Sequence, residues 1–419
     1  MKRTAPDRTA YQPKPVERVE VHEGNIKARI ILLILAILIA VIAFSFAIGS
    51  ATKVDTGWRE IEADTAEMNC SQDFEFNYYL GGSGISATAE IKAIVNLYTQ
   101  ATETAYRVFN TQEVFEGTNN LFFLNRNINT PVQVDPLLYQ AFELIHRLES
   151  RYVYLAPVYA EYHSLFYCND DWETAGYDPY QNADMAEYFQ QVADFARDPA
   201  SVNVELLGNN TLQLNVSEAY AAFAKENGVV NYVDFYWMKD AFIIDYLAQV
   251  MEDNGYNRGA ISSYDGFVCT LSAGQLSYSF NLYDLLKDST ACQAARLTYQ
   301  GGTSLVHLHS FPLNAQKEPY YYQFEDGTVR SAYADLADGK SKSAVPVMVA
   351  TSRTMGCAET LLRLLPCYAT DTLDAEALQT LAGEGIYPLY SQDRRIHATS
   401  PDVQIDNVLD GYEVITPQP

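Results

Sequence analysis

A single long apolar run near the N-terminus constrains this chain more than any other feature. Residues Ile30 to Ile48 read IILLILAILIAVIAFSFAI, nineteen residues without a charge, a proline or a glycine. At 1.5 Å per residue a helix of this length spans roughly 28 Å, close to the roughly 30 Å of hydrocarbon in a bilayer. A helix buried in a globular core usually has a polar face, and here only Ser45 is polar. The run therefore predicts one transmembrane helix.

The charges that flank the run predict its orientation. Lys and Arg are retained on the cytoplasmic side of a membrane. Seven of them precede the run, whereas the next two after it are Lys53 and Arg59. We expect a single-pass protein of the cell membrane, with a cytoplasmic N-terminus and an extracytoplasmic C-terminal domain. A cleaved signal peptide is the alternative, because small residues follow at 49–51, but the 29-residue lead and the long run favour a retained anchor.

The formal charge differs strongly between the two sides of the run. Residues 1–29 carry seven basic and four acidic side chains, a formal +3, so the remainder carries −28 of a total of −25. Nucleic-acid binding requires dense basic patches that neutralise phosphates, and none follows residue 53. Nucleic acid is therefore excluded as a partner. With 48% hydrophobic residues, the chain after the run can bury a substantial core.

The cysteines and the common short motifs identify no metal centre and no familiar catalytic site. The six cysteines lie far apart, without a CxxC pair or a Cys/His cluster, so zinc is not expected, and disulfides and free buried thiols both stay open. The chain contains no P-loop, GxGxxG, HExxH or GxSxG motif. His307 and His309 would share one face of a strand, but the neighbouring sequence supplies no third metal ligand.

Helical periodicity and capping residues predict the first helices of the folded part. Apolar residues recur at helical spacing over 86–109, where Ser86 or Thr88 is placed to cap. A second helix is predicted over 136–150, with Asp135 as its cap. The stretch between them is expected to be mostly loop.

The remaining segments read mainly as short strands joined by hairpin-sized turns. Further helices are expected before Gly255, at 359–366 and after residue 378. Strands or hairpins are predicted at 74–82, 202–216, 229–235, 258–272, 304–309, 320–326, 345–350 and 385–400. This order favours an α+β fold, with antiparallel sheets and packed helices, over a parallel doubly wound fold.

Four segments together have the layout of one known family. Residues 233–245 align without gaps with LDLGGIAKGYAVD, and 263–265 align with a Gly-Gly-Asp turn. Residues 326–339 align with DGxxYxHIxDPxTG, and CAETLLRLLP from Cys357 aligns with Ala-Asp-Ala-Leu-Ala-Thr. The retained residues are Asp234, Asp245, Asp265, Asp326, Gly327, Asp335 and Gly339. In this order of elements the chain resembles the ApbE family, the FAD:protein FMN transferases, from about Met68 to Ser400.

The apolar run, its flanking charges and the resemblance together predict a domain organisation. We expect a cytoplasmic arm at 1–29, the transmembrane helix at 30–48, a linker at 49–67, an ApbE-like extracytoplasmic domain at 68–405 and a C-terminal tail at 406–419. In this layout Met68-Asn69-Cys70 takes the place of the family's Met-Gly-Thr, and the loop ending at Asn127 takes the place of its Leu-Asn pair.

The resemblance also implies a cofactor, a metal and roles for single residues. The family uses FAD and magnesium. Asp335 would be catalytic, and Glu359 would stand for the aspartate that binds the metal, although a one-residue shift puts Ala358 there. The residues that would contact the cofactor are Asp234, Asp245, Asp265 and Gly339.

The departures from the family fall on the phosphate and metal positions. Tyr264 replaces a glycine, Asp240 replaces the lysine while Lys239 lies one position early, and Ala332 replaces the histidine. Glycine allows backbone N–H groups to approach phosphates, and a tyrosine side chain would take the space of the ligand. Arg363 replaces a threonine that would bind the metal, and its charge repels Mg²⁺.

Three interpretations of function follow from this pattern. The first is a binding or scaffolding module, with transferase activity lost or reduced, that serves another envelope or redox membrane protein. The second is an active magnesium-dependent transferase that moves FMN from FAD to a Thr or Ser of an exported protein. The third is an unrelated domain with a similar layout.

Each retained residue also has a purely structural interpretation. Aspartates such as Asp234, Asp265 and Asp335 are common in turns and caps. Glu359 and Arg363 are four residues apart on one helix and suit an ordinary ion pair, and Arg363 could also neutralise a phosphate without a metal.

Overall fold

The first compact unit of the chain contains the apolar run. The computed structural model describes residues 31, 34, 35, 37–41, 54–64, 70–272, 276–286, 290–313, 319–399 and 403–416, and it divides into the units Met1–Val54 and Asp55–Pro419. The described residues between 31 and 41 are helical, and their large apolar side chains are more than half exposed. No helix within the described residues is long and apolar enough to cross a membrane. Most of Ile30–Ile48 lies outside these residues, so the transmembrane helix stays a prediction.

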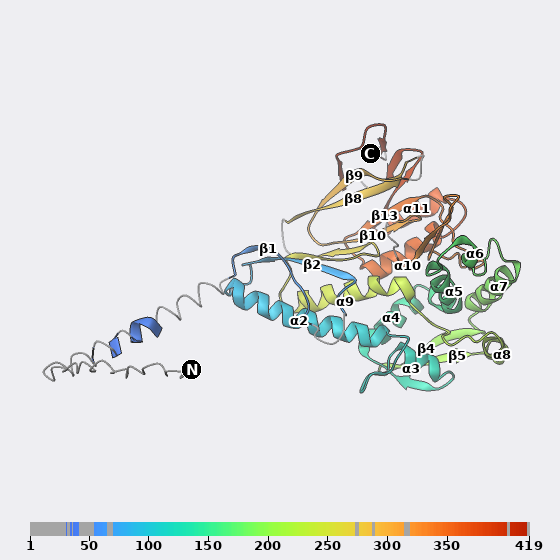
Figure 1. Cartoon of the computed structure of the whole chain (residues 1–419), viewed down its shortest axis with the longest axis horizontal. Helices are drawn as coiled ribbons and strands as arrows, with labels where there is room; N and C mark the ends of the chain where they lie inside the picture. The colour runs from blue at the N-terminus through green and yellow to red at the C-terminus, as the bar shows by residue number, and fades with distance from the viewer. Residues whose placement is uncertain are drawn as a thin grey trace, which may run out of the picture. The chain divides into compact units, whose positions relative to one another are not determined.

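A nine-stranded sheet organises the second unit (Figure 1). In spatial order its strands are β1 (Gly57–Glu60), β2 (Phe74–Leu80), β6 (Gly259–Ser263), β7 (Phe267–Thr270), β10 (Thr303–His309), β13 (Val347–Ser352), β14 (Ile386–Gln392), β15 (Arg395–Ala398) and β17 (Glu413–Ile415). Neighbours are antiparallel except for the last pair, β15 and β17. The antiparallel α+β prediction is confirmed. β1 lies in the stretch expected to be a linker and β17 in the expected tail, so the folded unit extends beyond the predicted boundaries at both ends.

Helices cover one face of this sheet and a second sheet covers the other. α9 (Lys239–Asp253) packs on β6 and β7, α10 (Cys357–Tyr368) packs on β10 and β13, and α2 (Ala87–Phe109) packs on α9. On the opposite face lies the three-stranded sheet of β16 (Gln404–Asp406), β9 (Ala291–Gln300) and β8 (Ser277–Leu285). Because β10 is covered on both faces, all seven of its residues are buried.

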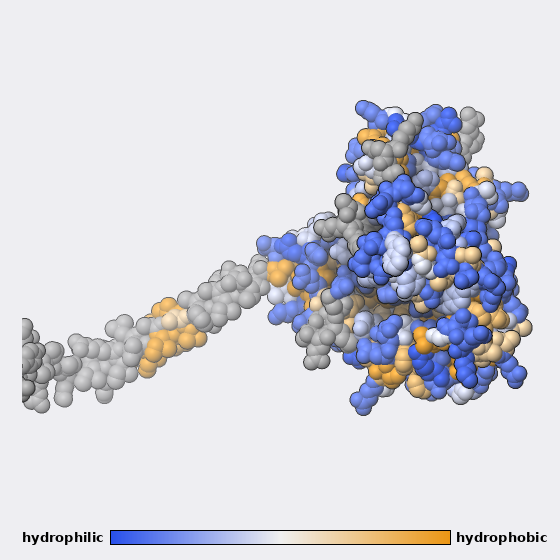
Figure 2. Space-filling view, turned by 45° about the vertical axis from the view of Figure 1, so that its right-hand side comes forward, coloured by the Kyte–Doolittle hydropathy of each residue, from blue (hydrophilic) through white to orange (hydrophobic). Residues whose placement is uncertain are grey.

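The core between the two sheets combines aliphatic side chains with the aromatic rings of Tyr278, Tyr299 and Phe311. Leu282, Ala295 and Leu297 of the three-stranded sheet pack against Leu305 and Val349 of the large sheet. The surface of the unit is different: Figure 2 shows hydrophilic residues over most of the visible face, with smaller hydrophobic areas between them. This surface agrees with the strongly acidic composition.

A smaller set of elements lies beside the helical face. It consists of α3 (Leu121–Arg126), β3 (Pro131–Gln133), α4 (Pro136–Arg147), a 3-10 helix (Tyr152–Leu155), α5 (Ala156–Phe166), α6 (Asp171–Thr174), α7 (Ala183–Arg197), β4 (Val202–Gly208), β5 (Thr211–Val216) and α8 (Glu218–Glu226). β3, β5 and β4 form a separate sheet. A hairpin of β11 (Tyr321–Gln323) and β12 (Val329–Ser331), and α11 (Ala375–Gly383), complete the unit.

Several local predictions are confirmed. The Ser86 side chain caps α2 by accepting from the Ala89 N–H, and the Asp135 carboxylate caps α4 by accepting from the Leu137 N–H at 2.9 Å. The predicted hairpin at 202–216 is β4 and β5. Such agreement is expected, because caps and hairpin turns depend on residues close together in sequence.

One local prediction is incomplete and one is wrong. The stretch at 110–127 is mostly loop, as expected, but it also contains α3, because the Asn120 side chain accepts from the Phe123 N–H and starts a helix. The strand expected at 229–235 is absent, and an irregular segment leads instead into a 3-10 helix at Tyr236–Met238. Of the two alternatives for the cysteines, the structure has six free thiols.

Candidate functional site

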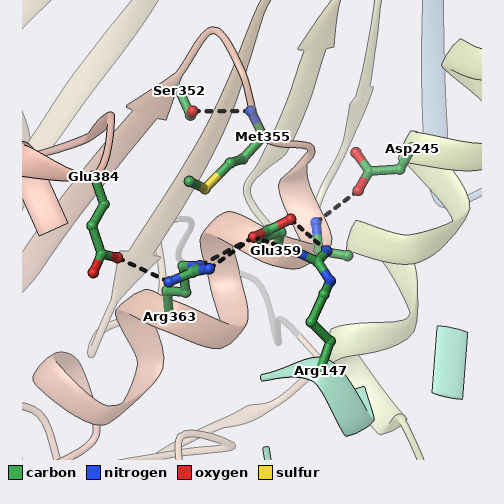
Figure 3. Close-up of polar contacts among 8 residues, drawn as sticks. Arg147, Asp245, Ser352, Met355, Glu359, Arg363 and Glu384 are labelled. Atoms are coloured by element: carbon green, nitrogen blue, oxygen red, sulfur yellow. Dashed lines mark hydrogen bonds and ion pairs between the residues drawn. The ribbon is translucent and has the colours of Figure 1, made fainter. Parts of the chain in front are cut away.

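A carboxylate from α9 caps the first turn of α10 by accepting hydrogen bonds from its backbone N–H groups. Gly356 is the N-cap and has no side chain to satisfy the free N–H groups. Asp245 supplies the acceptors: its Oδ1 lies 2.6 Å from the Cys357 nitrogen and its Oδ2 lies 2.9 Å from the Ala358 nitrogen (Figure 3). A Cβ at Gly356 would lie 2.3 Å from this carboxylate, so glycine is required here for space. Burial raises the pKa of Asp245 to about 6, and the two N–H donors limit that rise.

The Glu359 carboxylate is held by two arginines. Arg147, at the end of α4, donates to Oε1 at 3.1 Å and to Oε2 at 2.8 Å. Arg363, one turn along α10, donates to Oε1 from Nε at 3.2 Å and from Nη2 at 3.0 Å. Arg363 also donates to Glu384 at 2.9 Å, which extends the network (Figure 3). Burial works to raise the pKa of Glu359, but the two arginines outweigh it and the pKa lies below its usual value.

The residues around Glu359 do not fit a magnesium ion. Magnesium requires oxygen ligands in near-octahedral geometry. Here both oxygens of Glu359 already accept hydrogen bonds from guanidinium groups, and Arg363 places a positive charge beside them. No group of three or more His, Cys, Asp or Glu side chains within the described part of the chain has the geometry of a metal site.

Asp335, Gly339 and Lys342 belong to one compact loop, called the Lys342 loop, which the Lys342 side chain stabilises. The Lys342 ammonium lies 2.9 Å from Asp335 and 3.0 Å from both Asp338 and Asp371. Asp335 Oδ1 accepts from the Ala337 N–H, and its backbone carbonyl accepts from the Gly339 N–H. Gly339 has φ +72°, which favours glycine. These interactions give Asp335 the structural role of a turn residue with an ion pair.

In the loop before α9, the backbone at Tyr236 has a conformation that glycine usually adopts. Asp234 Oδ1 accepts from the Tyr236 N–H at 2.8 Å, and burial raises the pKa of Asp234. Tyr236 occupies the position of the family's first glycine and still has φ +47°, a left-handed conformation that is costly for a tyrosine. Its ring stacks on Tyr159 at 5.3 Å and meets Tyr320, itself at φ +74°, edge to face.

Two carboxylates meet at the start of α9. Asp240 is only 1% exposed. Asp265, in the turn between β6 and β7, lies close by. Burial raises the pKa of Asp240 to about 7, and Lys239 limits that rise. Burial and the charge of Asp240 raise the pKa of Asp265 well above its usual range. The pair therefore holds a proton near neutral pH.

A cavity of about 440 Å³ opens beside the start of α9. Its walls include Asp234, Tyr236 and Lys239 from the loop and helix, together with Tyr159 and Tyr320. A smaller cavity on the other side of Lys239 is lined by Asp240.

The structure brings only part of the predicted site together. Within the described residues, Asp234 lines the cavity, and Asp265 lies near the same end of α9. Asp245 instead closes the first turn of α10, Asp335 and Gly339 form the Lys342 loop, and Glu359 is paired with arginines.

Two residues that shape this region are not among the site residues assigned from the sequence. Arg147 lies 212 positions from Glu359, and a basic residue in the last turn of a helix is ordinary. Asn125 is buried and ties the loop before α9 to α3: its Nδ2 donates to the Val233 carbonyl, and its Oδ1 accepts from the N–H groups of Tyr232 and Val233. The neighbouring Asn127, which the sequence aligned with the family's loop, caps α3.

Comparison with solved structures identifies the architecture. The flavin transferase ApbE of Vibrio cholerae aligns with a TM-score of 0.53 and 10% identity, covering 84% of this chain and 98% of that one. The ApbE protein of Thermotoga maritima aligns with a TM-score of 0.53 and 11% identity, covering 84% and 97%. This chain has the ApbE fold. No family model and no curated protein matches its sequence.

The ApbE fold agrees with the order of elements on which the resemblance rests. The four aligned segments lie at or beside the starts of α9 and α10, in the β6–β7 turn and in the Lys342 loop. At about 10% identity, however, the likeness concerns the backbone, and the side chains of these segments make the local contacts described above.

Proposed function

We propose that this protein is an ApbE-fold binding or scaffolding module in which magnesium-dependent flavin transfer has been lost. The observation that carries the proposal is the pairing of Glu359 with Arg147 and Arg363. A magnesium ion at this position would have to displace Arg147 and remain beside the charge of Arg363, which is unfavourable by direct repulsion.

The first turn of α10 supports the same conclusion. A helix N-terminus can bind phosphate through its free N–H groups. In this chain the N–H groups of Cys357 and Ala358 are already bonded to Asp245, a carboxylate of the same charge sign as a phosphate. An incoming phosphate would be repelled and would find these donors occupied.

The proposed location is the outer side of the cell membrane, with the run Ile30–Ile48 as the anchor and a neighbouring envelope or redox membrane protein as the partner. The basic arm before the run and the acidic unit after it support this orientation. Protease treatment of intact and of permeabilised cells tests it. An acidic unit that is cleaved only after permeabilisation would overturn the orientation.

One observation favours the alternative of an active flavin transferase. Asp234, Tyr236 and Lys239 line a cavity of about 440 Å³ with aromatic walls, and ligand sites of this size and composition are common. FAD and magnesium would then be its substrate and metal.

The decisive experiment uses the full-length chain with FAD and Mg²⁺, with and without an exported acceptor protein that offers Thr and Ser. We expect no AMP release and no covalent flavin on the acceptor. Retained flavin without AMP would define the module as a flavin carrier, and no retained flavin would define it as a scaffold. AMP release with covalent flavin would overturn the proposal.

A matched variant tests the reason for the loss. Arg147→Ala combined with Arg363→Thr frees Glu359 and restores the hydroxyl found in the family's motif. We expect measurable Mg²⁺ binding by calorimetry in this variant and none in the unmodified chain. Arg395→Ala, which removes an exposed arginine near Glu413, is the control and should leave Mg²⁺ binding unchanged.

A further inference from the structure

A second cavity, of about 610 Å³, lies on the opposite face of the large sheet from α9 and α10. Its floor is formed by side chains of β2, β6, β7 and β10, and its roof by β8 and β9 of the three-stranded sheet. None of the residues that the sequence assigned to cofactor, metal or catalysis lines it. Its volume falls within the range of known small-molecule sites.

The walls of this cavity are aromatic and are held rigidly by one another. Tyr278 meets Trp58 edge to face at 6.2 Å and stacks on Tyr299 at 6.2 Å. The Tyr278 hydroxyl donates to the Gly259 carbonyl at 2.9 Å. Phe280 meets the imidazole of His307 edge to face at 5.1 Å. Flat rings fixed in this way suit a flat ligand, because little side-chain motion is lost on binding.

Two buried histidines provide the polar groups of the floor. His307 is 2% exposed and His309 is 4% exposed, with ring centroids 4.9 Å apart. Nε2 of His307 has no hydrogen-bond partner among the described residues. Burial holds the pKa of both imidazoles below the usual value, so both rings are neutral at pH 7.

The tautomer of His309 follows from its neighbours. Its Nδ1 lies 2.6 Å from the Phe311 carbonyl oxygen, which can only accept, so Nδ1 carries the proton. The Tyr321 hydroxyl, which donates to the His309 carbonyl, also lies near this nitrogen. Nε2 of His309 is therefore a lone-pair nitrogen that can accept a hydrogen bond.

The charge of the lining decides which ligands the cavity can take. Among the described residues that line it, Glu75 is the only one with a formal charge, and there is no Lys or Arg. A phosphate or carboxylate placed here would lose its hydration without gaining a counter-charge. Anionic ligands are therefore disfavoured.

We propose that the cavity between β10 and the β8–β9 hairpin binds a flat, uncharged aromatic molecule that forms a hydrogen bond with the His307–His309 pair. This site lies on the other face of the large sheet from α9, and it borders the α9 end of the molecule only through the β6–β7 turn. It assigns the module a ligand that carries no phosphate.

Equilibrium dialysis of the full-length chain with three probes tests the proposal. Riboflavin and lumichrome are neutral three-ring molecules with ring N–H donors, and FMN is the phosphate ester of riboflavin. We expect the neutral probes to bind and FMN to bind at least roughly tenfold more weakly, because the lining supplies no cation. Failure of both neutral probes to bind, or equal binding of FMN, would overturn the proposal.

Matched variants locate the binding. Ser262→Trp fills this cavity from its floor, whereas Ala160→Trp fills the cavity beside Lys239 from an exposed position. We expect Ser262→Trp to abolish binding of the neutral probes and Ala160→Trp to leave it unchanged. The opposite pattern would assign the probe to the α9 cavity and overturn the proposal.

A third variant keeps the test valid if Ser262→Trp does not fold. His307→Phe preserves the ring and removes its nitrogens, so affinity for lumichrome should fall by roughly tenfold, the effect of one hydrogen bond. Thermal unfolding of each variant verifies its fold. Unchanged affinity in folded His307→Phe and His309→Phe proteins would rule out the proposed hydrogen bond.

Discussion

The guanidinium of Arg147 contacts both carboxylate oxygens of Glu359, at 3.1 and 2.8 Å, across 212 residues of sequence. Arg147 is 59% exposed in its side chain and Glu359 only 15%. The pair joins the end of α4 to the first turn of α10.

The strength of this pair can be measured with a double-mutant cycle of Arg147→Ala and Glu359→Gln. Because the contact is bidentate but open to solvent, we expect a coupling free energy of about 0.5–1 kcal/mol from urea unfolding. The exposed pair Arg395 and Glu413, at 3.7 Å, is the control and should couple less. Equal coupling in the two cycles would contradict the special role of Arg147.

Removing the Asp245 carboxylate, which caps the N-terminus of α10, should destabilise the protein strongly. Asp245→Ala leaves two buried N–H groups without acceptors, so we expect a loss of about 2 kcal/mol in the free energy of unfolding. Asp245→Asn retains one acceptor oxygen and should lose about half as much. Asp326→Ala is the control, since its carboxylate accepts from the Thr328 N–H in an exposed turn. Similar losses for Asp245→Ala and Asp326→Ala would refute the capping role.

The buried carboxylate of Asp240 should make the protein less stable as the pH rises. Its pKa is raised by burial to about 7 in the folded state, above an unfolded value near 4. Because the pKa is higher in the folded state, protonated Asp240 contributes fully to the free energy of unfolding below about pH 4. This contribution to stability is lost as the pH rises through 7. Asp240→Asn should therefore flatten the profile of unfolding free energy between pH 5 and pH 8, by up to about 1.4 kcal/mol per pH unit. The exposed Asp253→Asn is the control. A profile equally steep in Asp240→Asn would show that Asp240 is not the source of the pH dependence and would assign it to another buried group such as Asp265.

The left-handed backbone of Tyr236 predicts an unusual order of stability for two substitutions. Tyr236→Gly and Tyr236→Ala both remove the ring that stacks on Tyr159, so this loss cancels between them. At φ +47° glycine is unstrained and alanine is not, so the glycine variant should be more stable by about 1 kcal/mol. Tyr188 lies inside α7, and there the alanine variant should be the more stable of the two. An alanine advantage at both positions would contradict the strained backbone.

The sequence alone determined the local helices, strands and caps, and the order in which they follow one another along the chain. The caps at Ser86 and Asp135, the hairpin at 202–216 and the strand that carries His307 and His309 were all predicted correctly. Each depends on the periodicity of side chains or on hydrogen bonds between residues two or three positions apart.

The roles of the retained aspartates were decided only by the tertiary structure. The sequence assigned Asp245 to a cofactor and Glu359 to a metal. The N–H donors that bind Asp245 lie 112 and 113 residues away, and Arg147, which binds Glu359 together with the nearby Arg363, lies 212 residues away. A carboxylate can cap a helix, pair with an arginine, bind a metal or share a proton. The groups that surround a carboxylate in the folded protein decide which of these roles it has. In this protein those groups are other residues of the same chain.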